Sequence, residues 1–157
     1  MNKPDITTLP RLGEIGLENF APYLMNRIIG RYNAALSSEM AVLGLTTPQM
    51  RSLAVLSVID GILIWELAVY AVVQQSTLSR ALDTLDQSGM IRRESDGKDS
   101  RATRVFITDS GREAGDRMWP HMAGAADAMF TGVDIAEKRA FVGTLQTILR
   151  NIRKHDF

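Results

Sequence analysis

Two short extended runs, "MIRRES" (residues 90–95) and "TRVFIT" (residues 103–108), interrupt a chain whose apolar residues otherwise recur at helical spacing. Their alternating residues and the intervening "DGKDSRA" predict a β-hairpin with a projecting loop. A single hairpin set among helices restricts the fold to a mainly α architecture with a small β element. The sequence therefore predicts the element order α-α-α-α-β-β-α-α.

Helical periodicity and capping residues define the helices on both sides of the hairpin. Thr46 with Gln49, and Asp134 with Glu137, have the spacing of capping boxes, and Thr108 can cap the helix that follows the hairpin. Gly89 is placed to end the helix before the hairpin. The expected helices cover residues 20–36, a stretch beginning at Thr46, 62–70, 74–88, 108–129 and 134–152.

Length and charge limit the number of domains and the type of partner. With 157 residues, 45% of them hydrophobic, the chain suits one domain with a real core. Lys and Arg number 18, as do Asp and Glu, so a nucleic-acid partner must be met by a local patch of charge. The chain has no cysteine, which excludes disulfides, thiolate metal sites and thiol-based redox switching.

The apolar segments do not have the character of membrane spans. The longest run, "GILIWELAVYAVV", contains Glu66 and is shorter than the roughly 18 residues that a span needs. The first residues, "MNKPDITTLPRLGEIG", lack the apolar core of a signal peptide. We therefore expect a soluble, cytoplasmic protein with no membrane partner.

The helix over residues 74–88 has a polar, exposed N-terminal end. Two helices followed by a hairpin is the order of a winged helix-turn-helix, in which the second helix enters the DNA major groove. Glutamine suits adenine, arginine suits guanine, and serine or threonine suits phosphate or either base. The alternative is an ordinary solvated helix face. The candidate DNA-binding residues on this helix are Gln74, Gln75, Ser76, Thr77, Ser79 and Arg80.

The loop of the hairpin supplies the second group of candidates, Lys98, Asp99 and Arg101. A wing beside a narrow minor groove needs a cation, because that groove concentrates negative potential. Arg101 is the candidate cation, and Asp99 is placed to hold its guanidinium by a charge-assisted contact. The alternative is a solvated charged loop, since Asp96 and Asp99 offset the local positive charge.

The run "GLTTPQMRSLAVL" followed by "STLSRALDTLDQSGMIRRESDGKDSRATRVFITDSG" resembles the MarR family of bacterial winged-helix transcription regulators. The shared features are G-L-T-x-x-Q at the opening of the second helix, T-x-S/T-R-x-x-D-x-L on the recognition helix, G-x-I-x-R into the hairpin, and D-x-x-D-x-R on the wing. The closing x-I-T-x-x-G also fits. No one of these motifs is specific alone, but their order is, and the terminal helices extend the resemblance to nearly the whole chain.

The resemblance implies a single domain, residues 1–157, that forms a homodimer on a pseudo-palindromic double-stranded DNA operator. Dimerisation helices would cover about 13–40 and 109–157, and the winged lobe about 46–108. Residues 74–80 would read the major groove and Arg101 the minor groove, with Asp99 steadying the wing. Members of the family commonly act as repressors, often released by small aromatic or anionic ligands. Carried onto this chain, the effector pocket would involve Tyr32, Met50, Arg51 and Trp65; the alternative is that these are core and surface residues of a regulator with no ligand.

The sequence departs from the family pattern around the third helix. Residues 62–70 are almost continuously apolar, which indicates either extra core, the interpretation we favour, or the lining of an effector pocket. Val72 stands where a turn glycine is common, and a β-branched residue resists positive φ. Gln74 replaces the usual Ser or Thr cap. These departures make the helix-turn-helix corner the part of the chain that the resemblance predicts least well.

Other function classes find little support in the residues. His121 and His155 are the only histidines, and no nucleophile or glycine-rich phosphate loop lies near either in the sequence. We therefore expect no enzymatic activity, no bound metal and no cofactor. The main alternative is a winged-helix module that binds protein without binding DNA, for which the apolar third helix is the only argument.

Overall fold

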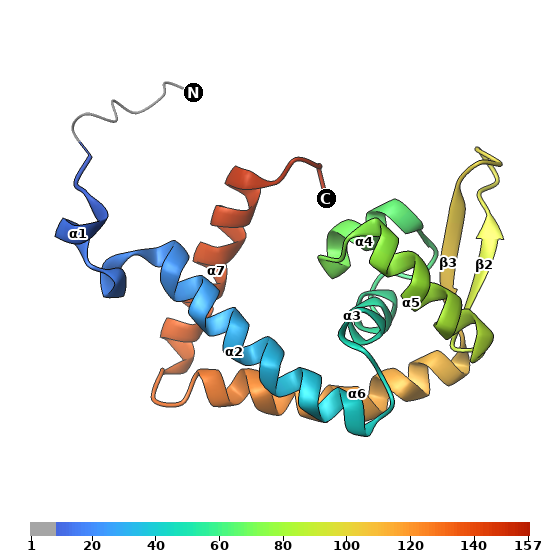
Figure 1. Ribbon diagram of the computed structural model, residues 1–157, viewed down its shortest axis with the longest axis horizontal. Coiled ribbons are helices and arrows are strands. Elements are labelled where there is room, and N and C mark those ends of the chain that lie inside the picture. Colours follow the sequence, from blue (N-terminus) through green and yellow to red (C-terminus); the bar gives the residue numbers. More distant parts are fainter. Residues whose placement is uncertain (1–8) are drawn as a thin grey trace.

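A computed structural model describes residues 9–157 and confirms a mainly helical fold with a small β element (Figure 1). The strands are β1 (Ile62–Leu63), β2 (Ile91–Ser95) and β3 (Thr103–Ile107). The short helices α1 and η1 near the start of the chain were absent from the predicted order. The helices are α1 (Leu12–Ile15), η1 (Leu17–Asn19), α2 (Ala21–Val42), α3 (Thr47–Leu56), α4 (Ile64–Ala71), α5 (Gln75–Gln87), α6 (Asp109–Met129) and α7 (Ile135–Ile152).

The elements form two regions, one made of α3, α4, α5 and the sheet and the other of α2, α6 and α7 (Figure 1). Helices α3, α4 and α5 pack together beside the small sheet, while α2 and α6 run alongside one another and α7 stands apart. In the part of the chain that the structure describes, no helix is both long and apolar enough to cross a membrane. One hydrophobic cluster connects the regions, because it takes residues from α2 and α6 as well as from α3–α5 and the sheet. It includes Leu36, Met40, Leu53, Leu67, Leu82, Val105 and Met118.

The sheet has one strand more than the hairpin that the sequence predicts. Residues Ile62 and Leu63, expected to begin a helix, instead form β1 and pair antiparallel with β3, giving the order β1-β3-β2. The Asp60 carboxylate fixes this edge, since its Oδ1 accepts hydrogen bonds from the backbone N–H of Gly61 (3.1 Å) and of Ile107 (2.9 Å). A two-residue apolar strand has no periodicity of its own, so only this tertiary pairing distinguishes it from the helix that follows.

The predicted N-terminal caps are confirmed. Thr46 Oγ1 accepts from the Gln49 backbone N–H (3.5 Å), and Gln49 Oε1 accepts from the Thr46 N–H (2.8 Å). The Asp134 carboxylate accepts from the Glu137 N–H (2.9 Å), while Glu137 Oε2 accepts from the Asp134 N–H (3.3 Å). Thr108 Oγ1 also accepts from the first turn of α6. These reciprocal contacts satisfy backbone donors that a helix leaves unpaired at its start.

Among residues 9–157, three helices end in the same hydrogen-bonded motif, in which a residue one or two positions after the helix adopts a left-handed conformation. The predicted glycine at the end of α5 is confirmed, because Gly89 has φ +71°. Gly44, with φ +73°, ends α2 in the same way. The third motif lies between α4 and α5, and the residue in the left-handed conformation there is Val72.

Candidate nucleic-acid interface

The first turns of α5 present a row of polar side chains anchored from behind by apolar ones. Leu78, Ala81, Leu82 and Leu85 are buried against the core, so the opposite face is fixed toward solvent. In the part of the chain that the structure describes, the Arg80 guanidinium makes no ion pair, which leaves it available to a ligand. Exposed on this face are Gln74, Gln75, Ser76, Thr77, Ser79 and Arg80.

The corner that sets the direction of α5 is held by Val72 and Arg51. Val72 has φ 52° and ψ 51°, and its N–H bonds the carbonyl of Val69 (3.2 Å). Arg51 donates to the Val72 carbonyl (3.1 Å) and, through its second terminal nitrogen, to Oδ1 of Asn33 on α2 (3.1 Å). One guanidinium therefore ties α2 and α3 to the turn before α5. Gln74 begins the helix with extended backbone and no side-chain cap.

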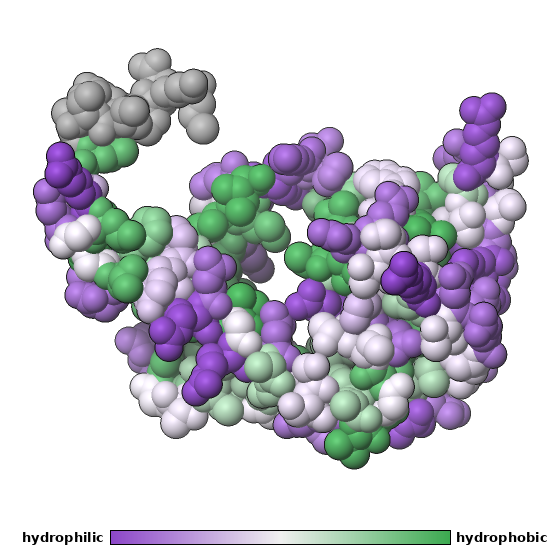
Figure 2. Space-filling model, viewed as in Figure 1, coloured by the Kyte–Doolittle hydropathy of each residue, from purple (hydrophilic) through white to green (hydrophobic). Residues whose placement is uncertain are grey.

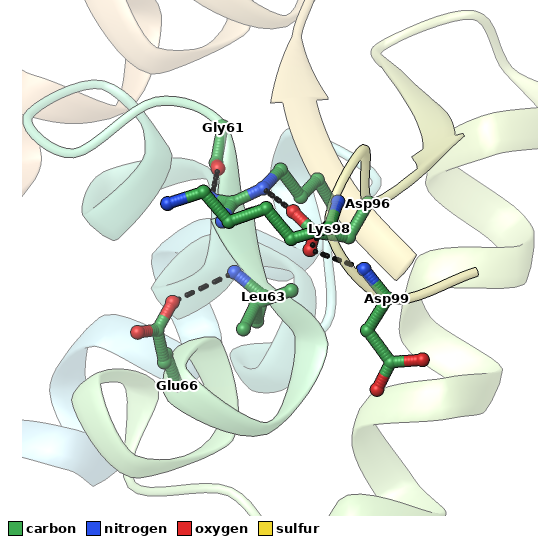
Figure 3. A network of polar contacts seen from close by, with 7 residues as sticks. Gly61, Leu63, Glu66, Asp96, Lys98 and Asp99 are labelled. Atoms are coloured by element: carbon green, nitrogen blue, oxygen red, sulfur yellow. Dashed lines mark hydrogen bonds and ion pairs between the residues drawn. The ribbon is translucent and has the colours of Figure 1, made fainter. Parts of the chain in front are cut away.

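The wing is organised around the carboxylate of Asp96 (Figure 3). From the sequence we had expected Asp96 only to offset the positive charge of the loop. Its Oδ2 accepts from the backbone N–H of Lys98 (3.2 Å) and of Asp99 (3.1 Å). Its Oδ1 accepts from Arg104 Nε (2.5 Å), and Arg104 also donates to the Gly61 carbonyl (2.7 Å). The Arg104 hydrogen bond, ahead of those from the loop backbone, holds the pKa of Asp96 below its ordinary value.

These contacts divide the three cations of the wing into two kinds. Arg104 is half-buried and joins the base of the wing to the β1 edge, so its charge is used within the protein. Lys98 and Arg101 are exposed. The expected contact between Asp99 and the Arg101 guanidinium is wrong: Asp99 Oδ1 accepts instead from the Arg101 backbone N–H (3.0 Å). Asp99 thus shapes the loop and leaves the guanidinium of Arg101 free of that contact.

A second ion-pair group connects the wing to the helix. Arg93 on β2 donates to Asp83 Oδ1 on α5 (2.7 Å), and its Nε lies 3.6 Å from Asp86 Oδ2. Arg93 is partly buried, whereas both carboxylates are more exposed. Because the two acidic residues lie one turn apart on α5, this arginine fixes the orientation of the hairpin relative to the helix.

Helix and wing meet on one face of the molecule. Gln75 at the start of α5 and Arg101 on the wing line the same small depression, together with Trp65 of α4. Thr77 and Arg80 line a neighbouring depression between α5 and the start of α3. The space-filling view shows hydrophilic residues at the projecting tip of the wing (Figure 2). Glutamine, hydroxyl and arginine side chains are thus grouped on one face, the arrangement required to contact base edges and phosphates together.

The four residues predicted for an effector pocket are not brought together. Met50 is only 3% exposed and belongs to the core, which corrects its assignment as a pocket residue. Arg51 is occupied at the helix-turn-helix corner, and Trp65 lies on the outer side of α4. Of the four, only Tyr32 lines a pocket of about 750 Å³ between α2 and α6. Partial burial raises the pKa of Tyr32.

The residues of that pocket were not found from the sequence, except for Tyr32. Two arginines on successive turns of α2 were the available signal, but Tyr32 was the one residue of α2 that we had assigned to a pocket. Among residues 9–157, no group of three His, Asp or Glu side chains is positioned to hold a metal ion. The pocket is lined by Arg27, Ile28, Arg31, Tyr32, Ala35, Glu39, Gly124, Ala125, Ala128 and Met129.

Comparison with known proteins identifies the fold and the family. The MarR family matches residues 43–102, which cover the helix-turn-helix and most of the wing. A MarR-family transcriptional regulator from Silicibacter pomeroyi, of known crystal structure, is 54% identical; the match covers 94% of this chain and 100% of that chain, with a TM-score of 0.90.

Two curated regulators are also similar. The HTH-type transcriptional regulator TtmR of Methylorubrum extorquens is 33% identical over 131 residues, which make up 82% of this chain but only 64% of TtmR. The chain therefore spans less than two thirds of the length of TtmR. The HTH-type transcriptional repressor IacR of Pseudomonas putida is 24% identical over 143 residues, 91% of this chain and 86% of IacR. The chain belongs to the MarR family of winged helix-turn-helix transcriptional regulators, DNA-binding proteins rather than enzymes.

Proposed function

We propose that this regulator is a homodimeric repressor that binds a pseudo-palindromic operator and is released by a small ligand. The observation that carries the DNA-binding part is the grouping of Gln75 and Arg101 beside one depression, with the exposed row of α5 continuing from it. The repressor assignment is supported by the similarity to IacR, which is named as a repressor.

In this proposal the start of α5 enters the major groove. Arg80 donates to a guanine edge, Gln74 and Gln75 bond adenine edges, and the hydroxyl side chains of Ser76, Thr77 and Ser79 bond phosphates or bases. The depth of insertion is set by the corner at Val72, which Arg51 holds in place. Arg51 and its two partners, Val72 and Asn33, all lie outside α5 and hold its start in place, so the reading face is positioned before DNA binds.

The wing contributes positioning. Arg101 enters or borders a narrow minor groove, where negative potential is concentrated, and Lys98 contacts phosphate. Asp99 supports this role by holding the Arg101 backbone, and Asp96 by closing the loop. The wing should therefore add a similar amount of affinity for every DNA sequence, whereas Arg80 should favour particular base pairs.

A second copy of the chain is the expected cover for the apolar terminal helices. Helix α7 has no buried residue, although Phe141, Val142, Leu149 and Ile152 lie along it with 43–71% of their surfaces exposed. Figure 2 shows hydrophobic surface over this helix. Leu24 and Ile28 of α2 are similarly exposed. An amphipathic helix must bury its apolar face, and a two-fold interface does so in a homo-oligomer.

The pocket between α2 and α6 is the proposed effector site. Arg27 and Arg31 supply positive charge, Tyr32 a ring and a hydroxyl, and Met129 a flexible apolar wall. This lining suits a small planar or carboxylated molecule. Because the pocket adjoins the exposed face of α2, a ligand there would alter the spacing of the two winged lobes in the dimer. The ligand releases DNA only if it binds more tightly to the dimer whose lobe spacing does not fit the operator.

The test of DNA binding is selection from a random duplex library, followed by mobility shift with the recovered sequence and with the DNA upstream of the gene. We expect an inverted repeat whose half-sites are centred about 10 base pairs apart. Arg80→Ala should weaken the shift, whereas Arg150→Ala, an exposed arginine on α7, should not. Recovery of no preferred sequence, together with a well-folded dimer by sedimentation, would favour the protein-interaction alternative.

The effector test uses salicylate as a planar carboxylated probe. Salicylate is titrated into the protein–operator complex while fluorescence anisotropy of labelled DNA reports release. Arg31→Ala should raise the concentration needed, and Arg117→Ala, on the exposed surface of α6 outside the pocket, serves as the matched control. Equal responses of the wild type and Arg31→Ala would place the ligand elsewhere.

A further inference from the structure

The end of the chain packs on helix α4 through a cluster of aromatic rings. Helix α7 ends at Ile152, Arg153 has extended backbone (φ −64°, ψ 146°), and residues 153–157, here named the C-terminal strap, leave the helix. The Phe157 ring centroid lies 5.4 Å from that of Trp65 and 5.2 Å from that of Tyr70. Figure 1 shows the strap reaching from the end of α7 toward α4.

His155 completes this cluster. Its ring stacks on Phe157 with centroids 5.4 Å apart and an interplanar angle of 15°, and it lies 5.8 Å from Trp65. Centroid separations of roughly 4.5–7 Å are those at which aromatic rings attract one another beyond simple burial of area. Two residues of the strap therefore contact two residues of α4, which makes the contact a specific one.

The cluster accounts for part of the unusual apolar character of α4. Trp65 and Tyr70 remain 44% and 39% exposed with the strap in place, so neither is a core residue. The interpretation of this helix as extra core is therefore wrong for these two side chains, although it holds for Leu67, which is fully buried. The exposed aromatic residues of α4 form a docking surface, and its occupant in the structure is the strap.

This docking surface adjoins the proposed reading face. Trp65, which carries the strap on one side, also lines the depression that contains Gln75 and Arg101. The main packing partners of α4 are otherwise α3, α5 and strands β1 and β3, all neighbours in the winged lobe. The strap is thus a connection from the end of α7 to the helix that precedes the recognition helix.

We propose that the C-terminal strap couples the terminal helices to the reading face, and that its release from α4 lowers operator affinity. The docked strap holds Trp65 and so limits movement of α4 and of the start of α5. When the strap is free, the binding-competent position of α5 is populated for a smaller fraction of the time, and the apparent dissociation constant rises in proportion. This inference rests on the proposed DNA-binding function for its readout of affinity.

The test compares Phe157→Ala with two matched variants in a Trp119→Phe background, where Trp65 is the sole tryptophan. Phe157→Ala should shift Trp65 emission to longer wavelength and raise the operator dissociation constant about three- to tenfold. Phe157→Tyr keeps the ring and should restore both values. Lys154→Ala, an exposed strap residue outside the cluster, should change neither. Sedimentation is used to check that each variant retains the parent's oligomeric state.

The outcomes separate the strap from the proposed function. Unchanged Trp65 emission in Phe157→Ala would overturn docking of the strap. Changed emission with unchanged operator affinity would overturn the coupling. If the parent protein binds no selected duplex, the proposed function fails, while the emission shift still tests the docking by itself.

Discussion

Replacing Val72 by glycine should stabilise this protein, although removing a side chain usually does the opposite. Val72 is the only non-glycine residue with positive φ in the part of the chain that the structure describes. Its φ of 52° lies in a region that a β-branched residue enters only against steric resistance. The two comparable helix ends use Gly44 and Gly89, which occupy the same region without that resistance.

The magnitude follows from two opposing effects. A non-glycine residue in this conformation costs on the order of 1–3 kcal/mol, which Val72→Gly would recover. Glycine adds freedom to the unfolded chain and so costs about 0.4–1 kcal/mol. Little burial is lost, since Val72 is 77% exposed. The free energy of unfolding should therefore rise by about 0.5–2 kcal/mol, or roughly 1–8 °C in Tm for a chain of this size.

The measurement is thermal and urea unfolding at a fixed protein concentration, because the stability of the proposed dimer depends on concentration. Val58→Gly is the matched control: Val58 is 83% exposed and its φ is not positive, so only the unfolded-state effect operates there. That control should lose about 0.4–1 kcal/mol. If both variants lose stability equally, the backbone at Val72 is not under strain and our account of the corner is incorrect.

Two further predictions concern the first turn of α6 and the wing. Gly111→Ala should lower the free energy of unfolding by about 1–3 kcal/mol, because a Cβ there would meet the Met90 carbonyl oxygen at 2.1 Å. The control Gly115→Ala has open space around it and should leave the free energy of unfolding unchanged or raise it by up to about 1 kcal/mol. Equal effects of the two variants in urea unfolding would contradict this. Measured by NMR, the pKa of Asp96 should lie below its ordinary value. Because the folded-state pKa is depressed, the contribution of Asp96 to the order of the wing is complete above the unfolded-state pKa and is lost as the pH falls through the folded-state pKa. Arg104→Ala should return the pKa of Asp96 toward its ordinary value.

The parts of the fold that depend on local spacing were predictable from the sequence. Thr46 with Gln49, and Asp134 with Glu137, were expected to cap helices, and both pairs do so, because the hydrogen bonds of a capping box join residues three positions apart. Gly89 likewise ends α5 as expected. The mainly helical architecture with a small β element followed from the same short-range patterns.

The parts that depend on distant residues were not predictable. Strand β1 exists only through its pairing with β3, and Arg104 bonds Gly61, 43 residues away in the sequence, a contact that no local spacing predicts. Arg51 was assigned to an effector pocket, but it holds the Val72 carbonyl. In each case the role of the segment or residue is decided by a partner that lies elsewhere in the chain, which short-range patterns in the sequence do not identify.

The central claim is that Arg80 reads a base while Arg101 positions the protein, and one set of anisotropy titrations tests it directly. Wild type, Arg80→Ala and Arg101→Ala are titrated against the selected operator and against operators substituted at each position of one half-site. Arg80→Ala should lose about 1–3 kcal/mol on the selected operator and lose preference at one base pair, whereas Arg101→Ala should bind all sequences more weakly, apart from a residual dependence on narrow A·T tracts. If Arg80→Ala retains the full preference of the wild type at every position, or if Arg101→Ala binds every operator as tightly as the wild type, the division of roles between α5 and the wing is contradicted.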